Sequence, residues 1–376
     1  MTYDITYLEN LLTNKKLVLI CDLDETLIST VCFDYLNVKV KDENYNYFSF
    51  KTKMSTSYYC MTKPKYLDTF LSAMSEKYEL HIMSIGTERY VKKCLEIIDP
   101  TKKYFGNRVV TRDGVIEGFN KAKTARTLFP FAENMIVVID DRLDVWENLS
   151  SVVQVRPFRK FIVEKEIVRK MCFYDALSAQ ERLQHCLLNK EDEEEYLPIL
   201  HNLLSDIHGK FFNEFSRLNR NIDFIDIIPD VRKIMSNKRQ QVLKDFAIYV
   251  ADRDDFDNSE LSVSTIIKTL GAVEKVLISP DVNIIVNNYS NSLLKLGIVN
   301  VTRGWLLDSY YNWRKEETGK YLRKTIGEIK NTLLRESVLN HVKIIFENAV
   351  KICSNHISKL PSYYRTFKRK FRKSQG

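Results

Sequence analysis

The sequence predicts an α/β protein with a doubly wound (Rossmann-like) parallel sheet, and two observations carry this prediction. Two continuous apolar runs, Leu17–Cys21 and residues 135–139, each end in acidic residues, which is typical of a strand buried on both faces of a parallel sheet. Between these runs, apolar residues recur at helical spacing, so strands and helices alternate along the chain. The functional residues of such a sheet are expected at the carboxyl ends of its strands.

The other elements of this first domain, residues 1–162, follow the same alternation. Their apolar patterns predict, in order, a helix at 65–78, a strand at 80–83, a helix at 88–98 and strands at 108–110 and 152–155. The polar segment 29–63, rich in Tyr and Asn, is predicted to be a flap inserted over the carboxyl edge of the sheet.

Three further regions follow the first domain. Residues 163–238 have a helical pattern and contain an acidic run at 191–195 that we expect on a solvated face or loop. Residues 239–322 predict a second, smaller α/β unit. Residues 323–376 predict a helical stretch that ends in a basic cluster.

Composition limits the class of protein. A chain of 376 residues predicts more than one domain, and 44% hydrophobic residues with 28% charged residues is normal for a folded protein. No apolar run approaches the ~20 residues that cross a bilayer, and the first ten residues lack the layout of a signal peptide. The seven cysteines are scattered, with no C-x-x-C pair, so we expect a reduced compartment (cytosol or nucleus) and no structural zinc.

The net charge of +8 is concentrated in the tail. Residues 323–376 hold 13 Lys and Arg against three Glu, a charge of +10, which leaves −2 for the rest of the chain. A nucleic-acid-binding core would carry a basic face of its own, so none is expected here. The basic cluster at 368–373 resembles a nuclear-import patch, or is a solvated end.

Acidic residues follow both buried strands. Asp22 and Asp24 lie two residues apart directly after the first strand, where a sharp turn can point both at one phosphate. Asp22 is predicted to attack phosphorus, and Asp24 to protonate the leaving oxygen and then activate water. Asp140 and Asp141 end the second strand, and acids this close to a dianion require a divalent cation, for which we predict Mg²⁺.

Two further residues complete the predicted site. Ser84 ends the strand at 80–83 and offers a hydroxyl to a phosphoryl oxygen, although a serine here is also a common helix cap. Lys123 is predicted to neutralise the transferred phosphoryl group, although a lysine is more often solvated.

These elements, in this order, resemble the haloacid-dehalogenase superfamily. LVLICDLDETLIST, from Leu17 onward, resembles the opening motif of the RNA polymerase II C-terminal-domain phosphatases. YELHIMSIGTERYV, VVTRDG and LFPFAENMIVVIDDRLDVW resemble the later blocks of the Fcp-type members, which associate with transcription factor IIF. Residues 239–322 are similar to a BRCT domain, with Trp305 at the signature tryptophan position.

The resemblance implies a nuclear phosphoserine phosphatase that acts on the polymerase tail through a phospho-aspartate. It assigns the nucleophile to Asp22, the general acid/base to Asp24, and phosphate binding to Ser84 and Lys123. The remaining roles that it assigns are metal binding and contact with or support of the substrate: Asp22, Asp140 and Asp141 for the metal, with the Asp24 carbonyl, and Thr26, Tyr78, Asp99, Arg112 and Arg142 for the substrate.

The sequence departs from the family pattern in two places. Glu88 stands where a basic residue is usual, with Arg89 one step later. In the BRCT-like unit, Ala251 and Asp252 replace the Ser/Thr-Gly of a phosphate pocket, so we predict that this unit places substrate or supports the fold without binding phosphate strongly.

Two other functions stay open at this stage. The chain is a scaffold if its phosphatase fold is inactive, although all predicted catalytic side chains are present. Alternatively, the same chemistry acts on another phosphoprotein or on phosphorylated nucleic-acid ends, which the net charge of −2 before the tail disfavours.

Overall fold

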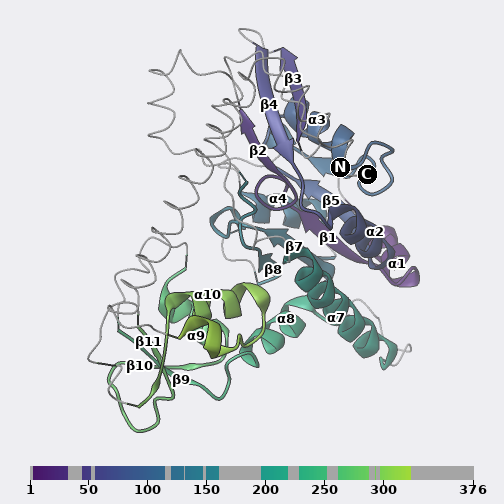
Figure 1. The fold of residues 1–376 in the computed structure, drawn as a ribbon. Helices are drawn as coiled ribbons and strands as arrows, with labels where there is room; N and C mark the ends of the chain where they lie inside the picture. Colours follow the sequence, from purple (N-terminus) through teal and green to yellow (C-terminus); the bar gives the residue numbers. More distant parts are fainter. Residues whose placement is uncertain are drawn as a thin grey trace, which may run out of the picture.

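A computed structural model describes most of the chain (Figure 1). The described residues are 3–32, 45–51, 56–114, 120–130, 132–146, 150–160, 196–218, 228–251, 261–287, 293 and 297–322. The acidic run 191–195, the tail 323–376 and Asp252 therefore lie outside the described residues.

The first domain is built on a five-stranded parallel sheet with strand order β6-β5-β1-β7-β8. Its strands are β1 (Leu17–Cys21), β5 (Tyr78–Met83), β6 (Val109–Val110), β7 (Ile136–Asp140) and β8 (Val152–Gln154). Every residue of β1 and of β7 is buried, as their continuous apolar runs predict. The predicted doubly wound sheet is confirmed.

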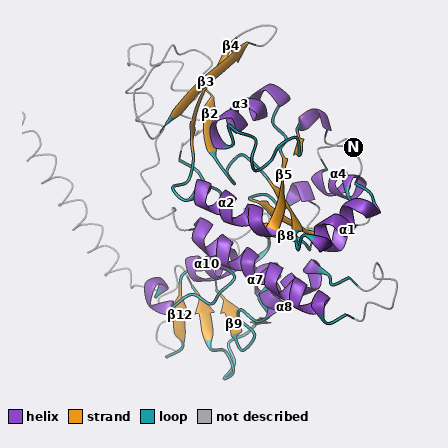
Figure 2. Cartoon of the chain, turned by 90° about the vertical axis from the view of Figure 1, so that its right-hand side faces the viewer, coloured by secondary structure: helices purple, strands orange, loops and turns teal. Residues whose placement is uncertain are grey.

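Helices flank this sheet (Figure 2). They are α1 (Ile5–Thr13), α2 (Leu67–Lys77), α3 (Glu88–Ile98) and α4 (Lys121–Leu128), with short 3-10 turns η1 (Arg112–Gly114), η3 (Glu133–Met135) and η4 (Asp144–Trp146). The Asn120 side chain begins α4 by accepting a hydrogen bond of 2.7 Å from the Lys123 amide. This cap fixes which residues of α4 face the sheet.

The predicted flap is a separate antiparallel sheet with strand order β2-β4-β3. Its strands are β2 (Ser29–Cys32), β3 (Asn46–Lys51) and β4 (Thr56–Thr62). Arg89 at the start of α3 donates to the Lys51 carbonyl at 2.7 Å. Arg89, which follows the Glu88 that departs from the family pattern, therefore ties the flap to the first domain.

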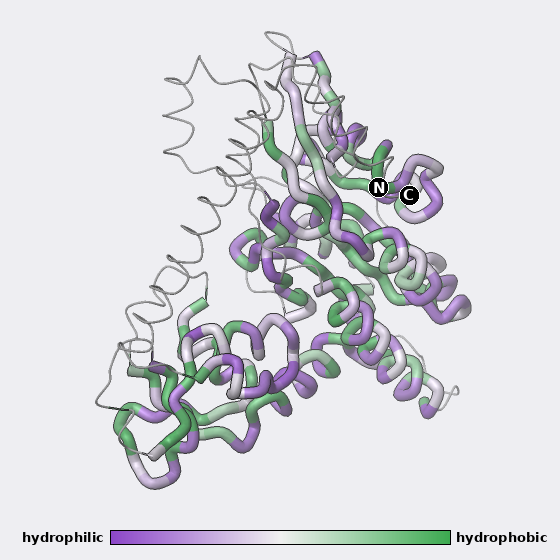
Figure 3. The backbone as a smooth tube through the Cα atoms, viewed as in Figure 1, coloured by the Kyte–Doolittle hydropathy of each residue, from purple (hydrophilic) through white to green (hydrophobic). Residues whose placement is uncertain are grey.

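The helical region packs on the first domain. Its described helices are α7 (Tyr196–Ser216) and α8 (Val231–Gln240). The buried residues of α7 recur every three or four positions, from Leu197 to Phe211. Figure 3 accordingly shows hydrophilic and hydrophobic residues alternating along this helix. Both helices contribute to the same core as the parallel sheet. No helix among the described residues has the length and apolar character that would let it cross a membrane.

The second α/β unit has a four-stranded parallel sheet of order β10-β9-β11-β12 and its own core. Its strands are β9 (Ala247–Val250), β10 (Val273–Lys275), β11 (Ile284–Val286) and β12 (Val299–Val301), with helices α9 (Val263–Thr269) and α10 (Arg303–Asn312) and the turn η9 (Thr318–Tyr321). Trp305 of α10 is fully buried, and its indole donates to the Glu316 carbonyl at 2.7 Å. The predicted second α/β unit is thus present.

Candidate active site

The strand ends of the first sheet bring three acids together. The backbone amide of Asp22 donates to the Ile139 carbonyl at 2.9 Å, which extends the β1–β7 ladder by one residue and sets Asp22 beside Asp140. One carboxylate oxygen from each of Asp22, Asp140 and Asp141 lies within 4.8 Å of the others, and all three residues are buried. Such a cluster is consistent with metal-dependent catalysis, because unpaired buried carboxylates are costly.

A buried lysine neutralises two of these acids. The Lys121 ammonium, from the first residue of α4, lies 2.5 Å from Asp22 Oδ1 and 2.7 Å from Asp140 Oδ2, and the side chain is only 2% exposed. Although burial opposes the charge, the two carboxylates raise the pKa of Lys121 above its ordinary value. The lysine is therefore protonated at neutral pH, as a ligand for an anion must be.

The structure does not bring Lys123, the predicted phosphate-binding lysine, into this site. Its side chain is exposed, because the Asn120 cap starts α4 at Lys121 and residues two positions apart point to opposite sides of a helix. The sequence did contain a signal that could have separated the two lysines. Recognising Asn120 as the cap places Lys121 on the inward face with Ala122 and Ala125.

The two adjacent acids have different surroundings. Asp140 is fully engaged: Oδ2 also accepts from the Trp146 indole at 2.6 Å, and Oδ1 accepts from the Arg142 amide at 2.9 Å. Asp141 has no ion pair with a Lys or Arg among the described residues. Burial, then Asp140 and Glu25, raise the pKa of Asp141 to about 7. Asp141 is thus the carboxylate that needs a cation, and the residues present fit a divalent metal held by Asp22 and Asp141, with Asp140 beside them.

Thr26 holds Asp141 in place. Its hydroxyl oxygen accepts from the Asp141 amide at 3.1 Å and lies 3.4 Å from Asp141 Oδ1, and the threonine is 1% exposed. This geometry makes Thr26 a support for a carboxylate, which differs from the substrate contact that the sequence suggested.

Asp24 is oriented by two hydroxyls. The chain turns sharply after β1, with Glu25 in the left-handed region at φ 58° and the amides of residues 27 and 28 donating to the Leu23 carbonyl. Asp24 Oδ1 accepts from the Thr30 hydroxyl at 3.1 Å and from the Tyr90 hydroxyl of α3. Burial raises the pKa of Asp24, and these hydrogen bonds oppose that shift. Sequence analysis missed Tyr90, because its role depends on a contact 66 residues away.

Ser84 lies at the end of β5 and lines the same cavity as Asp22. Its hydroxyl oxygen accepts from the Gly86 amide at 3.0 Å, and the residue is 1% exposed. The alternative that Ser84 caps the following helix is wrong, because α3 begins after Thr87.

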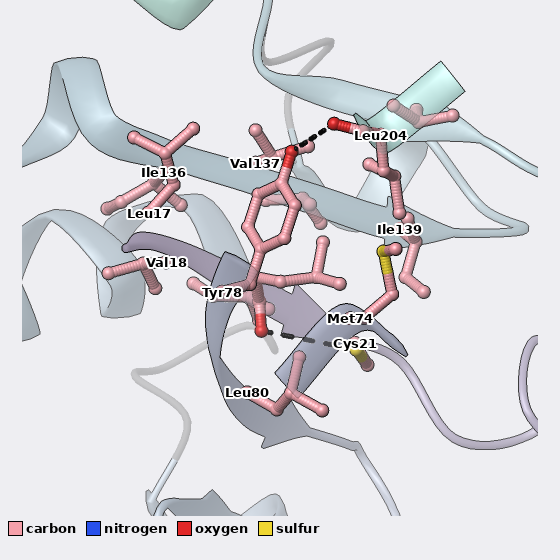
Figure 4. Packing of buried hydrophobic residues seen from close by; sticks show 14 of the residues in the cluster. Leu17, Val18, Cys21, Met74, Tyr78, Leu80, Ile136, Val137, Ile139 and Leu204 are labelled. Atoms are coloured by element: carbon pink, nitrogen blue, oxygen red, sulfur yellow. Dashed lines mark hydrogen bonds between the residues drawn. The ribbon is translucent and has the colours of Figure 1, made fainter. Parts of the chain in front are cut away.

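The four other residues that were predicted to contact or support the substrate do not lie together. Tyr78 is not at the site: its ring packs in the core and its hydroxyl donates to the Leu204 carbonyl at 2.7 Å (Figure 4). Asp99 is likewise structural, because Oδ2 accepts from the amides of residues 104 and 105. Arg112 is exposed and donates to the Ile85 carbonyl at 2.8 Å, next to the Ser84 strand end. Arg142 lines the cavity and pairs with Asp144 at 2.5 Å.

A cavity of about 530 Å³ opens from the acids toward the second unit. Its wall combines the site residues with two arginines of the first domain, Arg142 and Arg159, and with apolar and aromatic residues of α9 and α10. The residues from the second unit are Leu261, just before α9, and Ile266, Leu307, Tyr310 and Tyr311. The cavity thus has a charged end suited to a phosphate and an apolar end contributed largely by helices α9 and α10 of the second unit.

Known proteins match this arrangement. Residues 17–183 match the family model NIF, the NLI interacting factor-like phosphatases. The RNA polymerase II C-terminal domain phosphatase of Schizosaccharomyces pombe is 39% identical, over 39% of this chain and 22% of that protein. The Caenorhabditis elegans phosphatase of the same name is 29% identical, over 62% of this chain and 33% of that protein. The chain therefore spans about a third or less of the length of these two relatives.

A solved structure is also similar. The fission yeast RNA polymerase II CTD phosphatase Fcp1, bound to beryllium fluoride, aligns with a TM-score of 0.67 and 25% identity, over 85% of this chain and 99% of that one. The match confirms the predicted α/β fold class and the resemblance drawn from the motifs.

Proposed function

Because residues 17–183 match the NLI interacting factor-like phosphatases, we propose that this chain removes phosphate from phosphoserine in the C-terminal repeat domain of RNA polymerase II. In this proposal the reaction needs Mg²⁺ and passes through a phospho-aspartate on Asp22. The observation that carries the proposal is the buried Lys121 ammonium bridging Asp22 and Asp140 beside Asp141, the third acid of the cluster.

Asp22 is the proposed nucleophile. Lys121 holds one oxygen of its carboxylate, which fixes the side chain in the wall of the cavity. Burial and then Asp140 raise the pKa of Asp22, and Lys121 opposes this shift and favours the ionised form that attacks phosphorus. Mg²⁺ held by Asp22, Asp141 and the Asp24 carbonyl would screen the charge between nucleophile and phosphate.

Asp24 is the proposed general acid/base. Its raised pKa favours a protonated carboxyl, which can donate a proton to the leaving serine oxygen and accept one from water in the second step. Tyr90 and Thr30 hold this carboxyl by its Oδ1 atom, so the flap strand β2 and helix α3 both fix the acid.

The phosphoryl group is proposed to lie among Ser84, Lys121 and Arg142. All three line the cavity and supply one hydroxyl and two cations at its charged end. The alternative of an inactive scaffold is disfavoured, because the burial of Lys121 against two carboxylates is costly unless the charges serve a site.

The proposed substrate follows from the relatives, several of which are named RNA polymerase II C-terminal domain phosphatases. A nuclear location belongs to the same proposal, since that polymerase tail is the substrate. Association with transcription factor IIF stays a prediction from the resemblance alone.

Hydrolysis of tail peptides phosphorylated at one serine each, with Mg²⁺ and after chelation by EDTA, tests this function. We expect Mg²⁺-dependent release of phosphate and none from Asp22→Asn, because an amide is a far weaker nucleophile. Asp68→Asn is the matched control, since Asp68 is an exposed acid paired with Lys63 away from the cavity. Activity that survives EDTA, or that persists in Asp22→Asn, contradicts the proposal.

A further inference from the structure

The second unit docks on the outer strand of the first sheet. β8 is an edge of that sheet, and three alternate residues, two in β8 and one just after it, contact the second unit or the helix that leads into it. The Val152 carbonyl accepts from Arg239, whose guanidinium lies 4.1 Å from the centre of the Trp313 ring. At the far end, Arg156 pairs with Asp308 of α10. These contacts join both ends of this strand to α8 and to the second unit.

The middle contact reaches the active site. Gln154 pairs with Asp140 in the β7–β8 register, and its amide nitrogen donates to the Asp141 carbonyl at 3.0 Å. The amide oxygen of the same side chain accepts from the Tyr310 hydroxyl of α10 at 3.1 Å. Both Gln154 and Tyr310 are more than nine-tenths buried. One glutamine thus connects the second unit to the backbone of Asp141, one of the three clustered acids.

Two side chains support the backbone of Asp141. Thr26 holds its amide and one oxygen, and Gln154 holds its carbonyl, so these two side chains fix the peptide on both sides of the Asp141 Cα. The Gln154 amide is itself fixed by Tyr310, because a hydroxyl donor at the amide oxygen keeps the nitrogen directed at Asp141. Residues that orient a metal ligand in this way tune the affinity of the site.

We propose that Gln154 and Tyr310 are positioning residues that hold Asp141 for metal binding, so that the second unit completes the metal site of the first. This inference rests on the proposed function only for the identity of the metal as Mg²⁺. It predicts that a single hydroxyl on α10 changes metal affinity, although no atom of α10 is a ligand. A purely structural interface predicts a change in stability without such an effect.

The test measures metal binding to the full chain directly. Free Mn²⁺ is followed by electron paramagnetic resonance during titration of wild type, Tyr310→Phe, Gln154→Met and the double variant. Tyr249→Phe is the control, because it removes a hydroxyl from β9 in the same unit, away from the cavity. The Mg²⁺ concentration for half-maximal hydrolysis of p-nitrophenyl phosphate and the melting temperature are recorded alongside.

We expect Gln154→Met to weaken Mn²⁺ binding about tenfold and Tyr310→Phe roughly three- to fivefold, with Tyr249→Phe unchanged. The double variant should match Gln154→Met, because Tyr310 acts through Gln154. Wild-type Mn²⁺ affinity in Tyr310→Phe overturns the inference, whether or not the melting temperature falls; Tyr310→Phe decides the matter even if Gln154→Met does not fold.

The same data separate this inference from the proposed function. If wild type binds Mn²⁺ and the variants bind it less, but no protein hydrolyses phosphate esters, the inference is supported and the proposed function is wrong. If wild type is an active Mg²⁺-dependent phosphatase and all variants share its Mn²⁺ affinity, the inference alone is wrong.

Discussion

The two parallel sheets of this chain share an architecture and differ at their strand ends. In the first sheet, Asp22 continues the ladder after β1 by donating to the Ile139 carbonyl. In the second, Ala251 and Asn287 continue the ladders after β9 and β11 in the same way, donating to Val286 and to Val301. Similar backbone geometry thus presents a carboxylate in one sheet and a methyl or an amide in the other.

The chemistry of the two edges differs accordingly. Asn287 is fully buried, and its amide nitrogen donates to Asn300 Oδ1 at 3.0 Å, while the Asn300 amide nitrogen donates to the Ile298 carbonyl at 2.9 Å, so these neutral groups are hydrogen-bonded without an ion. The acids of the first sheet need a buried lysine, and Asp141 needs a further cation. The side chains at the strand ends, and not the sheet itself, therefore decide which domain is equipped for catalysis.

Removal of the buried lysine is expected to have the largest effect on the first sheet. Lys121→Met should lower kcat/KM on a small phosphate ester by at least about a hundredfold, because the transferred phosphoryl loses its cation. It should also destabilise the fold by roughly 3–5 kcal/mol, because Asp22 and Asp140 are left buried and unpaired. Lys123→Met, two residues away on the exposed side of α4, is the matched control. Urea unfolding and steady-state kinetics measure both effects; equal loss in the two variants would show that α4 is oriented differently.

The raised pKa of Asp141 predicts that the stability of the fold depends on pH. The pKa of Asp141 is raised to about 7 in the folded state, above the unfolded value near 3.9, so the folded protein binds this proton more tightly. In metal-free protein, Asp141 should therefore reduce the free energy of unfolding progressively as the pH rises from about 4 to about 7, by up to about 4 kcal/mol. Asp141→Asn lacks this titration.

The measurement is the difference in unfolding free energy between wild type and Asp141→Asn, from pH 4 to 8, in EDTA. The variant should gain on wild type as the pH rises, and excess Mg²⁺ should reverse the order, because only wild type keeps its ligand. A difference that does not change with pH would mean that Asp141 is paired in solution.

The hydroxyl on the general acid should have a smaller effect. Tyr90→Phe removes a hydrogen bond that lowers the pKa of Asp24, so that pKa should rise and the alkaline limb of the kcat profile should move to higher pH. We expect kcat at neutral pH to change by less than about tenfold. Tyr66→Phe, a change at an exposed tyrosine, should leave the profile in place. An alkaline limb that does not move would assign it to a group other than Asp24.

Local pattern predicted the framework of the first sheet well. The apolar run Leu17–Cys21 and the helix Glu88–Ile98 have the bounds that periodicity indicated, because burial on one or both faces is written into neighbouring residues. The positions of the acids were predicted from the same pattern, because the acids directly follow the predicted strands. What local pattern could not supply is the partner of each acid. Lys121 and Tyr90 reach their carboxylates across 99 and 66 residues. The Asn120 cap indicates which lysine of α4 points inward, but only the packing of α4 and α3 decides which acid each side chain reaches.

The smallest expected effect on catalysis belongs to the strand ends of the second sheet. Asn287→Ala leaves the buried Asn300 amide oxygen without its donor, which should cost about 1–3 kcal/mol of stability. Hydrolysis of p-nitrophenyl phosphate at 25 °C, well below the melting temperature, should stay within about twofold of wild type, because Asn287 does not line the cavity. Thermal unfolding and the steady-state rate, measured on one preparation, decide the case. Asn287→Asp is a second variant: the near-isosteric acid should destabilise the unit more as the pH rises, because Asn287 is fully buried and a buried carboxyl group is more costly when it is ionised. If Asn287→Ala instead lost activity while it kept its melting temperature, the second edge would take part in catalysis, and the division of roles between the two sheets would be wrong.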